Sequence, residues 1–66
     1  MLIELNGEPF ELDAETTLGM LIERMQLQGK RIAIEVNEEI VPRSQHQTYM
    51  LNAADKVEIV HAIGGG

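Results

Sequence analysis

Residues 2–12 read LIELNGEPFEL and residues 18–25 read LGMLIERM, and these two stretches predict how the fold begins. The first alternates apolar and polar residues on either side of Asn6-Gly7, a pair that tolerates the positive φ values of a two-residue hairpin turn. In the second, apolar residues recur from Leu18 with the i, i+3, i+4, i+7 spacing of one amphipathic helix. The chain therefore begins with a β-hairpin, which is followed by a helix.

Three more strands are predicted beyond the helix. Residues 32–36 and 56–60 alternate, with Ile34 and Ile59 facing the core. Residues 40–41 form a short strand that Pro42 halts, as suits the edge of a sheet. The order is strand, strand, helix, strand, strand, strand. This order predicts an α+β fold in which a mixed sheet of four to five strands packs on one main helix.

Details of the helix also follow from residue types. Thr16 or Thr17 can cap its N-terminus, and Gly29 is expected to stop it. Gly19 is unfavourable inside a helix, and we interpret it as a place where the helix lies close to the sheet. Two residues of the helix, Met20 and Met25, are expected to fill gaps in the core.

Composition narrows the possible partners. The chain has 66 residues, with five Lys and Arg against eleven Asp and Glu, so its formal net charge is −6. Nucleic acids and anionic membranes select basic patches, and this balance argues against both. No apolar run approaches the ~18 residues of a membrane span, and no leader-like segment precedes the hairpin. We therefore expect a single domain that works in the cytoplasm.

Residue types that carry catalysis are scarce. The chain has no cysteine, which excludes disulfides, thiolate metal sites and a cysteine nucleophile. The two histidines, His46 and His61, are not spaced as metal ligands; we expect His46 in a solvated loop and His61 at the end of the last strand. Ser44 is the only serine and lies in no nucleophile motif. The sequence predicts no catalytic residue and no metal site, and hence a protein that is not an enzyme.

The sheet face turned away from the helix is predicted to be acidic with an apolar patch. If the apolar residues of the strands face the helix, the residues that alternate with them point away from it. These outward residues include Glu4, Glu11, Glu35 and Glu58. This face is either simply solvated or an acidic rim around an apolar patch that docks on a basic partner. The residues of this candidate docking face are Leu2, Glu4, Ala33, Glu35, Glu58 and Val60.

Three consecutive glycines end the sequence directly after the last strand. They are either a frayed end or a functional thread. We expect a folded domain over residues 1–61 and a flexible tail over residues 62–66, which can extend ~17 Å. Because glycine has no Cβ, Gly64 and Gly65 form a thin thread. Together with Ile63 they could thread a partner's active-site channel and present the carboxylate of Gly66 there. The tail makes the chain a plausible substrate.

These residues resemble a known family. A hairpin, helix and strands of this length before a Gly-Gly end are similar to the β-grasp sulfur carriers related to ubiquitin, and more narrowly to the ThiS family of thiazole formation in thiamine biosynthesis. The resemblance covers essentially the whole chain. Its most specific part is the run from Asn37 to Arg43, which contains Ile-Val-Pro-Arg, together with the terminal glycines. One departure is Ala54, where a glycine is expected. The matching stretches are residues 6–8, 18–27, 34–43 and 57–66.

The resemblance implies a cycle that partner enzymes run. A ThiF-like adenylating enzyme uses ATP and Mg²⁺ to convert the carboxylate of Gly66 to an acyl-adenylate. A persulfide sulfur, supplied through a cysteine desulfurase system, then displaces AMP to leave a thiocarboxylate, and thiazole synthase accepts that sulfur. The chain itself is expected to bind no cofactor.

Other functions stay open at this point. The small subunit of molybdopterin synthase uses the same tail chemistry, although those chains resemble this one less. A ubiquitin-like modifier would instead form an isopeptide bond to lysine. A β-grasp regulatory module that binds RNA or a small ligand is a more remote alternative, against which the net charge of −6 counts. A free tail favours a monomer between encounters.

Overall fold

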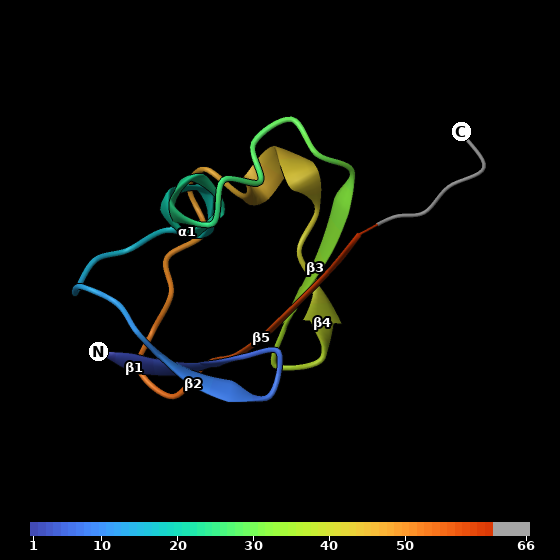
Figure 1. Ribbon diagram of the computed structural model, residues 1–66. Helices are drawn as coiled ribbons and strands as arrows, with labels where there is room; N and C mark the ends of the chain where they lie inside the picture. Colours follow the sequence, from blue (N-terminus) through green and yellow to red (C-terminus); the bar gives the residue numbers. More distant parts are fainter. Residues whose placement is uncertain (62–66) are drawn as a thin grey trace.

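The computed structural model describes residues 1–61, which form one α-helix over a five-stranded sheet (Figure 1). The strand order is β2-β1-β5-β3-β4, so the last strand of the chain lies at the centre. β1 and β5 are parallel and the other neighbouring pairs antiparallel, which confirms the predicted mixed sheet. The elements are β1 (Leu2–Leu5), β2 (Glu8–Glu11), α1 (Leu18–Arg24), β3 (Ile32–Val36), β4 (Glu39–Ile40), the 3₁₀ helix η1 (Arg43–Gln45) and β5 (Lys56–His61).

The hairpin predicted at the start of the chain is present. Leu5 pairs with Glu8, which leaves a two-residue loop between β1 and β2. The loop residues Asn6 and Gly7 have φ values of 50° and 85°, as a type I′ turn needs at both positions. β2 contains Pro9, which the sheet accommodates because β2 is an edge strand.

Helix α1 begins as predicted, and the N–H groups of its first turn all have acceptors. Thr17 is the N-cap, and its Oγ1 accepts from the Met20 N–H at 3.2 Å. The first two helical N–H groups donate to the carbonyls of Tyr49 and His46. The loop after η1 therefore closes over the start of the helix and satisfies groups that a helix leaves unpaired.

The helix ends before the glycine that was expected to stop it. Met25 is the C-cap, and Gln26 adopts a φ of 60°. The N–H groups of Gln26 and Leu27 donate back to carbonyls of Glu23 and Ile22 in the last turn, which is the Schellman arrangement. Gly29 lies in the turn that follows, so its predicted role as the helix stop is wrong.

Gly19 makes room for a side chain, and the prediction that the helix approaches the sheet there is wrong. A Cβ on Gly19 would lie 2.7 Å from Oε1 of Gln47 and 2.8 Å from its Cδ. The side chain of Gln47, in the loop after η1, occupies this space. A contact between residues so far apart in the chain leaves no local pattern.

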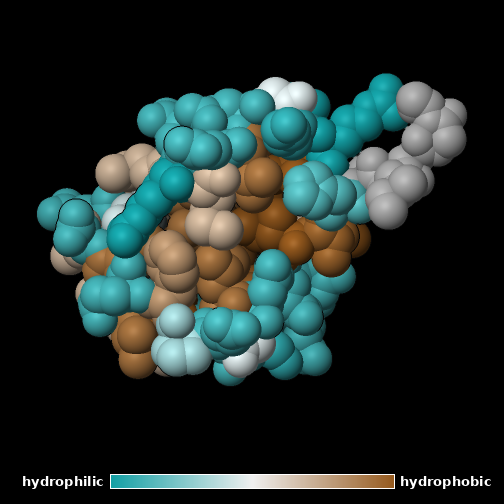
Figure 2. Space-filling model, in the orientation of Figure 1, coloured by the Kyte–Doolittle hydropathy of each residue, from teal (hydrophilic) through white to brown (hydrophobic). Residues whose placement is uncertain are grey.

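The hydrophobic core lies between α1 and one face of the sheet. Figure 2 shows apolar side chains gathered between the helix layer and the sheet, with hydrophilic residues around them. Met20 and Met25 were expected in this core but are 52% and 36% exposed, since the helix ends before Met25 and the sulfur of Met20 lies 3.5 Å from the N-cap nitrogen. The buried apolar residues are Ile3, Leu5, Leu12, Leu18, Leu21, Ile22, Ile34, Val36, Val41, Leu51, Val57 and Ile59.

β3 and β4 form a second hairpin at the other edge of the sheet. Its two-residue turn, Asn37-Glu38, has φ values of 54° and 70°. β4 lies one residue earlier than predicted, and Val41 is buried directly after it. The single turn of η1 then follows Pro42.

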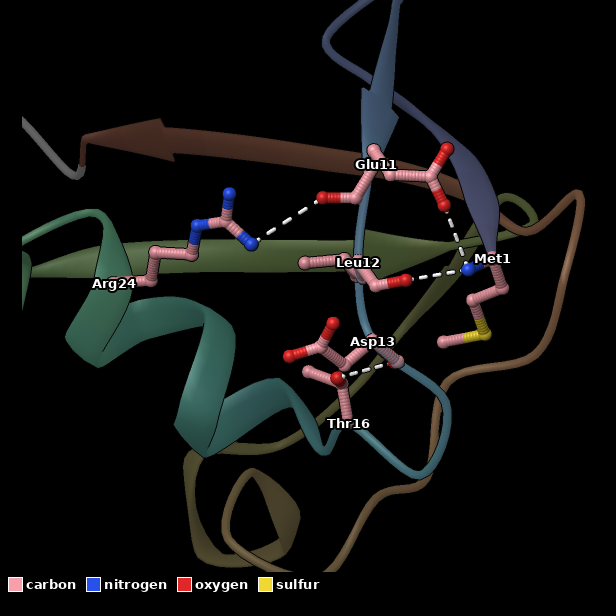
Figure 3. Close-up of polar contacts among 6 residues, drawn as sticks. All are labelled: Met1, Glu11, Leu12, Asp13, Thr16 and Arg24. Carbon is pink, nitrogen blue, oxygen red and sulfur yellow. Dashed lines mark hydrogen bonds and ion pairs between the residues drawn. The ribbon is translucent and has the colours of Figure 1, made fainter.

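Polar contacts lie within the first hairpin, between this hairpin and α1, and within the segment that leads into the helix (Figure 3). The Met1 ammonium pairs with the Glu11 carboxylate at 2.7 Å. Arg24, in α1, donates to the Glu11 carbonyl at 3.3 Å, and Oγ1 of Thr16 donates to the Asp13 carbonyl at 2.6 Å. Of the two threonines considered as caps, only Thr17 therefore caps the helix.

Candidate functional site

The outer face of the sheet, turned away from α1, carries the residues predicted to dock a partner. Strand alternation puts Glu58 and Val60 of β5 on this face, and both are exposed. Their partners across the β3–β5 pairing are Glu35 and Ala33. Four of the six predicted docking residues thus form one contiguous block beside the central strand.

A shallow hollow of about 140 Å³ lies within this block. Ile40 of β4 completes its lining and is 72% exposed. The sequence reasoning missed Ile40, although a signal existed: if Val41 faces the core, strand alternation turns Ile40 outward. We call the lining residues, Ala33, Glu35, Ile40, Glu58 and Val60, the outer-face hollow.

Two carboxylates oppose each other in the outer-face hollow. Glu35 and Glu58 are direct Cα partners on neighbouring antiparallel strands. Like charges placed directly opposite destabilise a sheet, so this pair costs stability. A lysine or arginine bound between the two carboxylates would be attracted to both, while its aliphatic stem could contact Ala33 and Val60.

Leu2 and Glu4 lie at a different part of the outer face. The parallel register places Glu4 beside Lys56, at the start of β5, whereas Val60 is near the end of that strand. The register therefore does not bring Leu2 into one patch with Ala33 and Val60. A second, open hollow of about 520 Å³ is lined by Leu2, Ile3, Glu4, Gly7, Pro9, Ala53 and Ala54.

The strand that leads into the tail is held from both sides. β5 pairs with β1 and with β3, and beyond the end of β1 the Ile59 N–H donates to Oδ1 of Asn6 at 2.8 Å. The last strand residue, His61, pairs with Ile32 at the start of β3. The predictions for the tail lie outside the described residues, namely Ile63, Gly64, Gly65, Gly66 and the flexibility of residues 62–66.

His46 is not the solvated loop residue expected from the sequence. It is only 6% exposed, and its Nε2 lies 3.0 Å from the Val41 carbonyl. The His46 carbonyl accepts from the first turn of α1, so the residue is part of the packing of the loop against the helix. Periodicity carries no signal for such a contact between irregular segments.

Among residues 1–61, no cluster of three or more His, Cys, Asp or Glu side chains is arranged to hold a metal ion. No helix in the same range has the length and apolar character needed to cross a membrane.

A helix packed across a mixed sheet, with a central last strand that leads to a glycine end, defines the ubiquitin-like β-grasp class. The crystal structure of the thiamine biosynthesis protein ThiS from Geobacter metallireducens agrees with this class. It matches with a TM-score of 0.86 and 25% identity, covering 100% of both chains. The predicted β-grasp fold is thereby confirmed.

Sequence comparisons narrow the class to one family. The model of the ThiS family matches residues 3–66. The sulfur carrier protein ThiS of Bacillus subtilis is 33% identical over 98% of this chain and 100% of its own. A thiazole synthase of Magnetococcus marinus is 39% identical over 100% of this chain, which spans only 20% of that protein. The protein belongs to the ThiS family, the ubiquitin-like sulfur carriers of thiamine biosynthesis.

Proposed function

We propose that Gly66 carries the sulfur: its carboxylate is adenylated, converted to a thiocarboxylate and used by thiazole synthase. The observation that carries this proposal is that the match to the ThiS family runs through the glycine end, residues 3–66. Family membership favours this function over a molybdopterin synthase subunit, a protein modifier and a regulatory module. The chain is then a co-substrate and its partners are the catalysts.

The chemistry explains why activation is needed. A chain-terminal carboxyl group ordinarily has a pKa of about 3.5, so at neutral pH it is an anion that resists nucleophilic attack. Attack of a carboxylate oxygen on the α-phosphorus of ATP, with Mg²⁺ in a ThiF-like partner, releases pyrophosphate and forms an acyl-adenylate. The terminal sulfur of a persulfide, supplied through a cysteine desulfurase, attacks the acyl carbon and AMP leaves. A thiol then cleaves the S–S bond and leaves the thiocarboxylate.

In this proposal the chain holds the start of its tail in a fixed position, and the tail reaches the partner's active site. The pairing of β5 with two neighbours, together with the Asn6 side chain, holds the point from which the tail begins. From there residues 62–66 can span at most ~17 Å. Gly64 and Gly65 would pass a channel too narrow for larger side chains, since glycine adds no Cβ to the backbone, and Ile63 would precede them along the same path.

The outer-face hollow is the docking surface in this proposal. Its two opposed carboxylates, Glu35 and Glu58, suit a basic group on a partner, and the exposed Ile40 and Val60 beside them suit apolar contact. Leu2 and Glu4 would meet a more distant part of the same partner.

The sulfur chemistry can be tested by intact mass. The chain is incubated with ATP, Mg²⁺, a ThiF-like enzyme and a persulfide donor, and we expect the mass to rise by the difference between one sulfur and one oxygen. Deletion of Gly66 should abolish this change while the circular dichroism spectrum stays unchanged. An unmodified full chain, under conditions in which a known carrier reacts, would refute the proposal.

The docking surface can be tested by charge reversal. Glu58→Lys removes half of the opposed pair and adds a repulsive charge, and we expect the dissociation constant for the adenylating partner to rise about tenfold or more. Glu38→Lys makes the same charge change in the exposed β3–β4 turn. Equal effects of the two substitutions would mean that the outer face of the sheet is only solvated and docks no partner.

A further inference from the structure

A cleft on the helix side of the molecule differs in charge from the rest of the chain. It encloses about 310 Å³ between the end of α1, the turn that follows and the loop after η1, segments that lie above and to the left of β3 in Figure 1. Lys30 from the turn and Arg43 from η1 both line it, together with Glu23. The chain has a net charge of −6 and only five Lys and Arg, so two of these five cations are gathered in one cleft.

Local structure fixes the backbone that carries both cations at the rim of the cleft. The Lys30 N–H donates to the Leu27 carbonyl at 3.1 Å and closes a turn in which Gly29 has a φ of 74°. Arg43 begins η1, and its carbonyl accepts from the His46 N–H at 3.1 Å. Neither cationic side chain forms an ion pair with another residue among 1–61, so both keep their charge available for an anion.

The cleft also contains an amide that the helix makes room for. Gln47 lines the cleft and lies against Gly19, where a Cβ would come within 2.7 Å of its Oε1. A glycine is unfavourable in a helix relative to alanine, and here it frees the space that this amide occupies. The amide nitrogen of Gln47 can donate to an anion that the two cations attract.

The cleft lies at the end of the sheet from which the tail leaves. Ile32 lines the cleft and is the Cα partner of His61, the last residue of β5. An enzyme that receives the residues after His61 must therefore approach this end of the molecule.

We propose that this cleft binds a carboxylate-bearing segment of the enzyme that activates the Gly66 carboxylate. The inference rests on the proposed function, and it adds a second contact whose charge is opposite to that of the outer-face hollow. Ammonium, guanidinium and amide groups together match the acceptor oxygens of a carboxylate. Two contacts of opposite sign on the two sides of the sheet fix the orientation of docking, because a rotated approach would bring like charges together.

Kinetics with the adenylating enzyme test the proposal. For Lys30→Gln and Arg43→Gln we expect the KM for the carrier, followed by pyrophosphate release, to rise about three- to tenfold at low salt with kcat unchanged. The rise should shrink at high salt. Lys56→Gln removes the same charge outside the cleft and should change KM less than twofold. Equal effects of all three substitutions would overturn the proposal, whereas a wild-type chain that is not adenylated would refute the proposed function instead.

Two variants distinguish an effect on binding at the cleft from an effect on the stability of the fold. Gly19→Ala places a Cβ where the Gln47 amide lies and should raise KM without lowering the thermal midpoint, since alanine favours the helix. In a Gln47→Ala background the same change should leave KM unaltered. An additive increase in KM would overturn the role of the amide.

A probe peptide tests the cleft without any enzyme. Acetylated tetraglutamate added to the full chain should shift the NMR signals of Lys30, Arg43 and the Gln47 amide, and leave those of Lys56 unmoved. The absence of such shifts, or equal shifts with inorganic phosphate, would overturn a carboxylate site. If amidation of the Gly66 carboxylate shifts the same signals with no peptide present, the occupant is the chain's own tail, and the proposal also fails.

Discussion

A positive φ value strains the backbone only where the side chain does not tolerate the left-handed region. Asn6 and Asn37 occupy such positions in the two hairpin turns, and asparagine tolerates them. Ala54 has a φ of 69° as well, although its Cβ makes this conformation unfavourable by about 1–2 kcal/mol. It is also the residue at which the family resemblance leads one to expect glycine. The turn conformation at position 54 therefore favours glycine, and this chain departs from that preference by having alanine there.

Ala54→Gly should raise the free energy of unfolding by about 1 kcal/mol, because glycine adopts the left-handed conformation without a steric penalty. Urea denaturation measures this change. Ala53→Gly serves as control, since Ala53 has no positive φ, and it should lower stability by increasing the entropy of the unfolded chain. An equal or greater gain at Ala53 would contradict the assignment of the strain to Ala54.

Gly19 and His46 show where reasoning from single residues fails. Both were interpreted from their immediate neighbours, one as a contact with the sheet and the other as a solvated residue. In the structure each is determined by the loop of residues 46–49, which packs on α1 and places Gln47 against Gly19. Such contacts depend on the path of a long irregular segment, and that path has no periodic signature.

At the scale of elements, alternation and helical spacing predicted every strand and the helix, while their ends were less well predicted. The apolar spacing of α1 extends to Met25, but hydrogen bonding ends the helix at Arg24. The residue after the C-cap is Gln26, with a φ of 60°. Glycine is the usual residue there, so the sequence reasoning chose Gly29 for the helix stop.

Gln26→Gly should stabilise the domain by about 0.5–1 kcal/mol, since it removes the Cβ from a left-handed position while the capping hydrogen bonds stay intact. The midpoint of thermal unfolding should rise accordingly. Gln28→Gly, two residues further along at a position without a positive φ, should lower that midpoint. If both variants shift it in the same direction, the C-cap assignment is wrong.

At the scale of the whole molecule, excess negative charge is placed where it costs stability. Glu35 and Glu58 oppose each other on the outer face, in a chain whose net charge is −6. A pair that destabilises the free domain fits a surface that gains energy when a basic partner covers it. Stability and docking should therefore respond in opposite directions to a change at this pair.

Glu58→Gln should raise the free energy of unfolding by about 0.2–1 kcal/mol at low ionic strength, and the gain should fall as salt screens the repulsion. The same variant should bind the adenylating partner more weakly than wild type. Glu8→Gln removes the same charge opposite an apolar residue, Leu5, and corrects for the effect of net charge. A gain no larger than that of Glu8→Gln would show that the opposed pair carries no strain.

The sequence by itself determined the order and type of the elements, the two-residue turn at Asn6-Gly7 and the resemblance to the ThiS family. These features are local, because periodicity, turn chemistry and a terminal motif are written in neighbouring residues. Only the tertiary structure decided that Ile40 joins the outer-face hollow, that Leu2 lies apart from it, and that Lys30, Arg43 and Gln47 share a cleft. Those relations depend on strand register and on how a loop packs across a helix, which join residues far apart in the chain.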